Sequence, residues 1–153
     1  MRQQTGNVTI GNEYGAHLTS LRFFPKPLNK SCYHLPVDPH VPYLLRLSFL
    51  VGSYNYSGFQ QMPSFAVSFE TMGTLYMRNI TIADRDPFFG ERILASSGTV
   101  LYICFIRTLE SVDPFISAIE SRKLQDGMYG QVKPGTILEN VCRIDVGGGN
   151  ETR

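Results

Sequence analysis

The chain has 153 residues, and its 14 Lys and Arg residues against 13 Asp and Glu residues give a formal net charge of +1 at pH 7. This length is enough to bury one hydrophobic core and not two, while a hydrophobic content of 42% excludes a wholly disordered chain. The near-neutral charge excludes the basic surface typical of nucleic-acid binding, and the longest apolar run, residues 41–51, is far shorter than the roughly 20 residues of a membrane-spanning helix.

Apolar residues recur with a period of two along most of the chain, which predicts β-strands rather than helices. Residues 43–49 and 64–70 alternate apolar with polar side chains and are predicted to be strands buried on one face. Residues 99–107 are apolar on both faces and rich in β-branched and aromatic residues, which is typical of a central strand covered on each side. Further strands are predicted at residues 76–82, 91–95 and 115–122.

The segments 25–27, 36–42, 52–63 and 84–90 contain seven of the 9 Pro residues and three of the 14 Gly residues, and they are predicted to be turns that connect the strands. Several short strands divided by such turns indicate an antiparallel β-sandwich. The pattern changes after Leu124, because residues 125–153 contain an Asp-Gly turn, a Pro-Gly pair and three consecutive glycines. This last segment is predicted to be a linker that leaves the sandwich.

Five of the seven Asn residues stand two positions before a Ser or Thr, which is the acceptor pattern for N-linked glycans. With 22 Ser and Thr residues in the chain, only about one such match is expected by chance. The sequence therefore predicts a secreted glycoprotein, but residues 1–6 contain no apolar stretch that could form a signal peptide, so we expect a fragment of a longer protein. The predicted acceptors are Asn7, Asn29, Asn55, Asn79 and Asn150.

The three cysteines are Cys32, Cys104 and Cys142. An oxidising compartment favours pairing, but three cysteines leave one unpaired and allow three single-bridge connectivities. No two of them lie within four residues of each other, and no His pair accompanies them at ligand spacing, so a structural zinc site is not expected.

Seven short blocks between residues 22 and 122 follow one another in the order and spacing of a known family. They are residues 22–25 (RFFP), 31–37 (SCYHLPV), 43–49 (YLLRLSF), 52–55 (GSYN), 63–65 (PSF), 103–106 (ICFI) and 114–122 (PFISAIESR). They resemble the signatures of plant malectin-like domains, among them YLIRATF, GNYD, PxFD, VCLV and PFISxLELR. The chain departs from the pattern at Ala66, where the family has an acidic residue, at residues 109–113, which replace a glycine-rich turn, and in lacking Trp.

This resemblance implies a jelly-roll β-sandwich over residues 5–124 that lacks the family's first strand. It also implies that residues 125–153 lead toward a second malectin unit, because residues 143–148 resemble the opening of that unit. In this family tandem malectin-like units form the extracellular part of plant receptor-like kinases and receptor-like proteins, which are anchored in the plasma membrane. The resemblance thus implies a cell-surface module that recognises a ligand without catalysis and without a cofactor.

Two binding sites are weighed on this basis. Tyr54, Tyr56, Phe59 and Gln60, together with Asn55 and Gln61, form a loop with the aromatic and amide groups that bind a glucose-type oligosaccharide or a cell-wall glycan. Alternatively, Tyr54 closes the end of the sandwich by packing, and Asn55 only carries a glycan. The other site would bind a secreted peptide or a co-receptor through exposed aromatics and Arg at Arg85, Phe88, Phe89 and Arg92, a stretch that could equally be an ordinary solvated turn. A structural protein–protein interaction module with no sugar binding is the alternative function.

An enzyme is not predicted. His34, Asp38 and His40 could supply a two-histidine, one-carboxylate metal site, but three prolines make this segment an extended loop and no facing ligand is identified. The acidic group Asp84, Asp86 and Glu91 would need facing positions in a cleft to hydrolyse a glycosidic bond. We further expect Cys32 and Cys104 to lie in the core region of the sandwich, close enough to form a disulfide, and assign Cys142 no partner.

Overall fold

The computed structural model describes residues 4–7, 15–51, 63–72, 74–82, 86–110 and 112–142, and within these ranges the chain is almost entirely β. One short 3-10 helix, η1 (Ala16–Leu18), precedes the second strand. The strands are β1 (Gln4–Asn7), β2 (Ser20–Phe23), β3 (Lys30–Pro36), β4 (Pro42–Phe49), β5 (Ser64–Thr71), β6 (Thr74–Thr81), β7 (Phe88–Ala95), β8 (Val100–Ile106), β9 (Phe115–Ile116), β10 (Ala118–Lys123) and β11 (Ile137–Glu139). The predicted all-β antiparallel sandwich is therefore confirmed.

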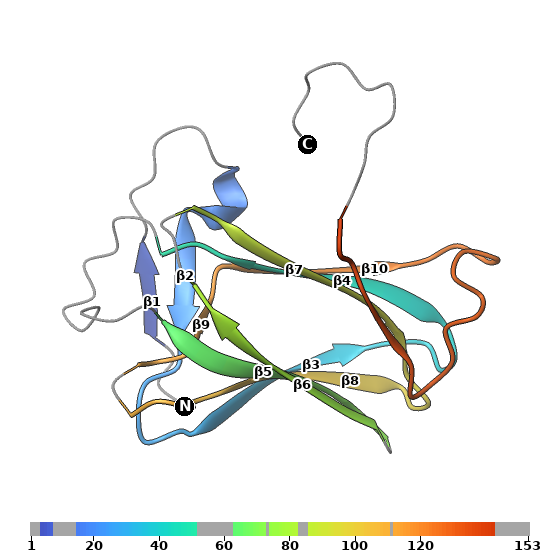
Figure 1. The fold of residues 1–153 in the computed structure, drawn as a ribbon, viewed down its shortest axis with the longest axis horizontal. Coiled ribbons are helices and arrows are strands. Elements are labelled where there is room, and N and C mark those ends of the chain that lie inside the picture. Colours follow the sequence, from blue (N-terminus) through green and yellow to red (C-terminus); the bar gives the residue numbers. More distant parts are fainter. Residues whose placement is uncertain are drawn as a thin grey trace.

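The strands form two four-stranded sheets and one small three-stranded sheet. Sheet I has the order β10-β4-β7-β11, and sheet II has the order β3-β8-β5-β6. Figure 1 shows these two sheets as separate layers, with the small sheet β1-β2-β9 at one end of both. Strands that are neighbours in a sheet are rarely neighbours in the sequence, because the chain crosses repeatedly between the two layers, as in a jelly roll.

The core lies between sheets I and II and is rich in aromatic rings. Phe49 of β4 is fully buried, and its ring centroid lies 5.8 Å from that of Phe65, 6.5 Å from that of Phe105 and 6.0 Å from that of Phe115. Since side chains alternate along a strand, the residues predicted to face inward from 43–49 and 64–70 are those found in this core. They include Leu45, Leu47, Phe49, Phe65, Val67 and Phe69.

Two of the predicted strands show how the sheets are divided. The predicted central strand is β8, which lies between β3 and β5 in sheet II. The single strand predicted at residues 115–122 is divided at Ser117, so that β9 pairs with β2 in the small sheet and β10 pairs with β4 in sheet I. The break is held by Ser117, whose Oγ accepts a hydrogen bond of 2.9 Å from the backbone N–H of Leu50.

Residues 125–142 differ from the predicted linker. After β10 the chain makes three turns, closed by backbone hydrogen bonds from Met128 to Gln125, from Val132 to Tyr129 and from Thr136 to Lys133. It then adds β11 to the edge of sheet I, where Leu138 lies opposite Ile93. This part of the segment is thus the last strand of the sheet, because apolar side chains anchor it there. The remainder, residues 143–153, lies outside the described residues.

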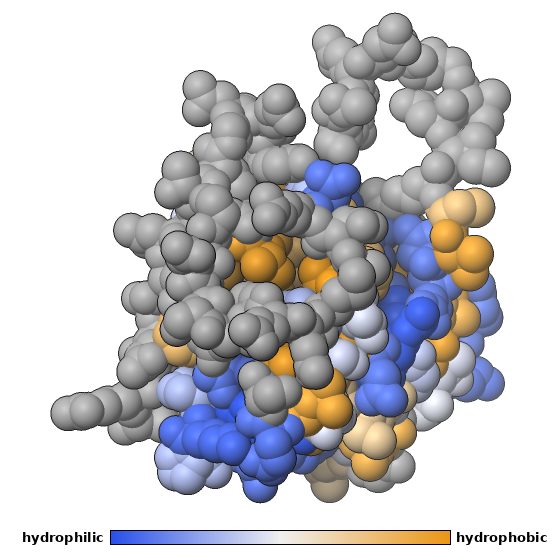
Figure 2. Space-filling view, turned by 60° about the vertical axis from the view of Figure 1, so that its left-hand side comes forward, coloured by the Kyte–Doolittle hydropathy of each residue, from blue (hydrophilic) through white to orange (hydrophobic). Residues whose placement is uncertain are grey.

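Within the described ranges, none of the helical structure is long or apolar enough to cross a bilayer. On the face shown in Figure 2, hydrophilic and hydrophobic residues are interspersed over the described surface.

Candidate functional site

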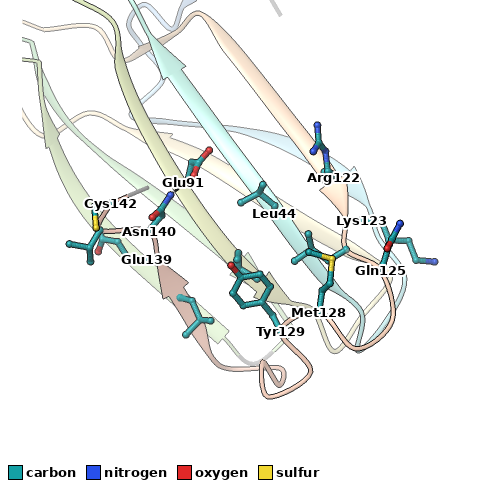
Figure 3. Close-up of a pocket in the computed structure, with 14 residues that line it drawn as sticks. Leu44, Glu91, Arg122, Lys123, Gln125, Met128, Tyr129, Glu139, Asn140 and Cys142 are labelled. Carbon is teal, nitrogen blue, oxygen red and sulfur yellow. Dashed lines mark hydrogen bonds between the residues drawn. The ribbon is translucent and has the colours of Figure 1, made fainter. Parts of the chain in front are cut away.

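A groove of about 840 Å³ lies on the outer face of sheet I, between the segment that follows β10 and the end of β11 (Figure 3). Its size falls within the range typical of ligand pockets, which is roughly 300 to 1,000 Å³. It is lined by Leu44, Glu91, Ile93, Arg122, Lys123, Leu124, Gln125, Met128, Tyr129, Leu138, Glu139, Asn140, Val141 and Cys142. The groove therefore joins residues from four strands and the two segments that flank β11.

The floor of the groove is apolar because of the alternation of side chains along sheet I. The residues of β4, β7 and β11 that do not face the core present Leu44, Ile93 and Leu138 side by side on the outer face. Leu124 and Val132 pack onto this surface and are buried with Ile93, forming a second, small hydrophobic cluster. These contacts hold the segment after β10 against the sheet, so this segment becomes a wall of the groove.

One end of the groove is polar and closed by hydrogen bonds. The Glu91 side chain is only 8% exposed, and its Oε1 accepts a 2.7 Å hydrogen bond from Nε of Arg46. Its Oε2 accepts a 2.6 Å hydrogen bond from Nδ2 of Asn140, which lies next to it in Figure 3. Hydrogen bonding to Glu91 raises the pKa of the Arg46 guanidinium, although burial opposes the shift. Two hydrogen bonds therefore hold the Glu91 carboxylate in position.

The opposite wall presents Met128 and Tyr129, whose side chains are 47% and 42% exposed. Tyr129 has a φ of 55°, a left-handed conformation that is uncommon for residues other than glycine. Such a conformation costs on the order of 1 kcal/mol, and strained residues of this kind cluster at ligand-binding sites. Gly127, two residues earlier, has a φ of 86° and allows the turn that precedes Tyr129. The fold thus holds a large aromatic ring at the groove in an unfavourable backbone conformation.

The rim on the β10 side carries two cations, Arg122 and Lys123, and Figure 3 shows Arg122 on the far side of Leu44 from Glu91. Nζ of Lys123 donates a 2.7 Å hydrogen bond to Oδ2 of Asp38. This contact lowers the pKa of Asp38, first through the hydrogen bond and then through the positive charge, and it raises the pKa of Lys123.

Replacing Lys123 with Met should raise the pKa of the Asp38 carboxyl toward its ordinary value of 3.8. The pKa of Asp38 is lower in the folded protein than in the unfolded chain. The ion pair therefore stabilises the fold at a pH above the pKa of the unfolded chain, and this stabilisation is lost as the pH falls through the pKa of the folded protein. Carboxyl ¹³C NMR titration of both proteins measures this, with Lys133→Met as a control at an exposed cation elsewhere. Identical titration of Asp38 in all three proteins would contradict the assignment.

The loop predicted to bind sugar, with Tyr54, Tyr56, Phe59 and Gln60, lies outside the described residues, as do Asn55, Gln61, Asp84 and Arg85. Phe88 and Phe89 lie at the start of β7 and are 39% and 48% exposed. The ring of Phe88 also lies 5.9 Å from that of Phe49, so this residue is partly a core contact. Neither lines the groove on sheet I.

Arg92 is not the exposed loop residue that the sequence suggested. It lies in β7 opposite Leu45, so its side chain faces the space between the sheets and is almost fully buried. Its guanidinium donates a 2.8 Å hydrogen bond to Oε1 of Glu139 and lies 6.0 Å from the ring centroid of Tyr76. Burial lowers the pKa of Arg92, but the guanidinium still forms an ion pair with the carboxylate of Glu139.

The three residues considered for a metal site do not converge. His34 stacks edge-on against Tyr102, with ring centroids 4.7 Å apart, while Asp38 contacts Lys123. His40 has a φ of 65° and donates its backbone N–H to the carbonyl of Ser96. Among the described residues, no group of three His, Cys, Asp or Glu side chains is placed to hold a metal ion.

Cys32 of β3 lies directly opposite Cys104 of β8, and the structure joins their sulfur atoms at 2.13 Å. Cys104 is fully buried, as predicted, but the pair lies on the outer side of sheet II, because the neighbouring Ile103 and Phe105 occupy the inner face of β8. Cys104 is buried on the outer side of sheet II, and Cys32 is exposed there. Cys142 is free and exposed at the rim of the groove.

Two of the predicted glycan acceptors have described side chains, Asn29 and Asn79, and both are exposed. Asn29 immediately precedes β3, and Asn79 lies on β6 between the inward-facing Arg78 and Ile80, so it faces outward from sheet II. The side chains of Asn7, Asn55 and Asn150 lie outside the described residues.

The groove residues that sequence reasoning missed come largely from 122–142, which had been assigned mainly to a linker. The available signal was the series of apolar residues Leu124, Val132 and Leu138 among turn residues, which anchor the segment to the sheet. Tyr129 between Met128 and Gly130 offered a second signal, since a large aromatic residue in a turn needs a surface to contact.

Comparison with known proteins agrees with this architecture. The structure superposes on the crystal structure of the plant peptide RALF23 in complex with FER and LLG2, with a TM-score of 0.69 at 19% identity over 91% of this chain and 40% of that one. It also superposes on the extracellular domain of ANXUR2 from Arabidopsis thaliana, with a TM-score of 0.63 at 18% identity over 80% of this chain and 33% of that one. At these identities the likeness shows the fold.

Sequence relatives give the family. The uncharacterized protein At1g24485 of Arabidopsis thaliana is 34% identical over 131 residues, which are 84% of this chain and 25% of that protein. The probable LRR receptor-like serine/threonine-protein kinase At4g20450 of the same plant is 32% identical over 137 residues, covering 82% of this chain and 14% of the kinase. The chain thus spans a quarter or less of the length of these relatives. The family model of the malectin-like domain matches residues 3–153, and the chain therefore belongs to the malectin-like domain family.

Proposed function

We propose that the chain is a non-catalytic, extracellular ligand-recognition module of a plant receptor-like kinase or receptor-like protein. We further propose that the groove on sheet I holds a peptide ligand. The observation that carries this proposal is the groove itself, with its apolar floor, its fixed polar end and the strained Tyr129 on its wall. The relatives support the receptor context, because several are named as LRR receptor-like kinases.

A peptide suits the groove because one short chain can present an apolar side chain, a carboxylate and main-chain hydrogen-bonding groups together. The floor of Leu44, Ile93 and Leu138 would bind an aliphatic or aromatic side chain. The amides of Gln125 and Asn140 at the rim can bind main-chain groups. Arg122 forms no ion pair within the described part of the chain and would bind a carboxylate of the ligand. A structural neighbour is solved in complex with a plant peptide, which is consistent with a peptide here.

Carbohydrate binding is the second candidate, and it rests on different residues. The loop with Tyr54, Tyr56, Phe59 and Gln60 contains the aromatic and amide groups that stack on and bind sugars. The groove on sheet I offers one exposed aromatic ring above a largely aliphatic floor, which favours a peptide over a glycan. The two candidates therefore make separate predictions for the same protein.

Tyr129→Gly should weaken peptide binding by about ten- to thirtyfold while leaving the fold intact. Glycine adopts the left-handed conformation of residue 129 without strain, so this variant removes the ring and preserves the turn. Peptides selected from a display library on the immobilised chain, and a synthetic RALF23 peptide, serve as probes in isothermal titration. Tyr102→Ala is the matched control, since this tyrosine is 38% exposed on the outer face of sheet II.

A glycan array with glucose oligosaccharides and cell-wall fragments separates the candidates. Binding of glycans that is lost in Tyr54→Ala and Tyr56→Ala, with no peptide bound, would reject the peptide proposal. Peptide binding that Tyr129→Gly leaves unchanged would reject the groove as its site.

A further inference from the structure

β10 forms an open edge of sheet I. Within the described part of the chain its only neighbour in that sheet is β4, with Ala118 opposite Ser48 and Lys123 opposite Tyr43. The backbone N–H of Leu124 donates a 3.0 Å hydrogen bond to the carbonyl of Pro42, which fixes the alternation of the ladder. In an antiparallel pair, the even-numbered residues of β10 therefore direct their backbone groups toward β4, and the N–H and C=O of Ile119, Ser121 and Lys123 point outward.

The side chains beside this edge leave it accessible. A second groove, of about 460 Å³, runs along the seam between β10 and the neighbouring strands β2 and β3. Ile119 and Ser121 line it from β10, and Tyr33 and Leu35 line it from β3. Ser121 lies on the side of β10 that faces sheet II and is nevertheless exposed, so nothing in the described structure closes the sandwich here. A further strand could pair with β10 and cover this seam.

We propose that β10 pairs antiparallel with β10 of a second copy of this chain, about a two-fold axis at Ser121. Ser121 then lies opposite Ser121 of the second copy, and Ile119 lies opposite Lys123 of the second copy. These are the residues whose backbone groups point outward, so the pairing forms about six inter-chain hydrogen bonds. The two copies of sheet I become one continuous sheet.

Charge complementarity selects this occupant and this register. Glu120 and Arg122 flank the axis, so Glu120 of each copy lies opposite Arg122 of the other. These are the non-hydrogen-bonded pairs, in which opposed side chains approach most closely. A shift by two residues in either direction places Glu120 opposite itself or Arg122 opposite itself, and a shift by one residue breaks the hydrogen-bond alternation. The sequence of β10 thus favours one self-pairing register and opposes its neighbours.

The same strand lacks two of the usual features that prevent edge pairing. Natural edge strands are commonly protected by proline, by a bulge or by charged side chains, lysine above all. β10 has no proline, and its six residues pair with β4 without a bulge. Its lysine, Lys123, is already paired with Asp38, and Glu120 lies 3.4 Å from Nη1 of Arg46. Arg122, of opposite sign to Glu120, makes no ion pair among the described residues.

Charge reversal tests the register in the full 153-residue chain by sedimentation velocity over a concentration series. The wild-type chain should dimerise reversibly, and Glu120→Arg should weaken the dimer by at least about tenfold by opposing two arginines. The double variant Glu120→Arg/Arg122→Glu restores the complementary pairs and should recover the dimer. Lys133→Glu, a charge reversal at an exposed residue outside β10, should leave it unchanged.

Ser121→Pro tests the backbone pairing separately. The N–H of Ser121 points away from β4, so proline removes no hydrogen bond within sheet I and should leave the melting temperature nearly unchanged while abolishing the dimer. A wild-type chain that stays monomeric, for instance because a strand from another polypeptide occupies the edge, would overturn the proposal. So would a dimer that persists in Ser121→Pro or a double charge reversal that does not restore it.

Discussion

Replacing Arg107 with Met should lower the free energy of unfolding by about 3–5 kcal/mol. The Arg107 side chain is only 3% exposed and pairs with the largely buried carboxylate of Asp113. Its guanidinium also donates hydrogen bonds of 2.6 Å to the carbonyl of Val112 and 3.0 Å to the carbonyl of Phe24. Methionine fills a similar volume but leaves the Asp113 carboxylate and two carbonyls without this donor, which explains the large effect.

Urea denaturation monitored by circular dichroism measures this loss. Arg122→Met is the matched control, because this arginine is exposed, and it should change the free energy of unfolding by no more than about 0.5 kcal/mol. The double variant Arg107→Met/Asp113→Leu removes both charges and should be less destabilised than the sum of the single variants. Equal effects of the Arg107 and Arg122 substitutions would contradict the structural role of Arg107.

Replacing both Cys32 and Cys104 with Ala should lower the free energy of unfolding by about 2–5 kcal/mol. The proposed disulfide joins residues separated by 72 positions in the sequence, so it strongly restricts the unfolded chain. It also links β8 to β3, an edge strand of sheet II whose single neighbour within the described part of the chain is β8. The stability difference should disappear when both proteins are unfolded in a reducing agent.

Peptide mapping of secreted protein without reduction tests the pairing directly. We expect one linked peptide pair containing Cys32 and Cys104, and a Cys142 peptide that reacts with a thiol reagent in the native protein. Cys142→Ala is the matched control and should leave the stability nearly unchanged, since this thiol is free and exposed. Recovery of Cys32 and Cys104 as free thiols would reject the disulfide.

Much of the fold could be predicted because period-two alternation reports directly on burial in a sandwich. The strands at 43–49, 64–70 and 99–107 were predicted within one or two residues of β4, β5 and β8. The division between β9 and β10 could not be predicted, because it depends on the side chain of Ser117 meeting Leu50, a residue far away in the sequence. Local propensity contains no information about such a contact.

The candidate site was much less predictable than the fold. Turn residues made 125–142 look like a linker, whereas a few buried contacts by Leu124, Val132 and Leu138 hold it on sheet I. Arg92 was misplaced because a charged residue in a short motif was read as exposed, while β-strand alternation turns it inward, where Glu139 pairs with it. In both cases the tertiary partner, which the local pattern does not show, determines the position.

The outward orientation of Asn79 has a consequence for how the molecule meets its surroundings. This residue and Asn29 lie on or beside sheet II, whereas the groove with Tyr129 and the ladder of β10 belong to sheet I. Oligosaccharides attached at these two positions would shield the side of sheet II, and neither acceptor with a described side chain lies on sheet I. Such a coat would hinder the approach of a partner to sheet II more than to sheet I, so that glycosylation itself would help to choose which surface a partner can reach.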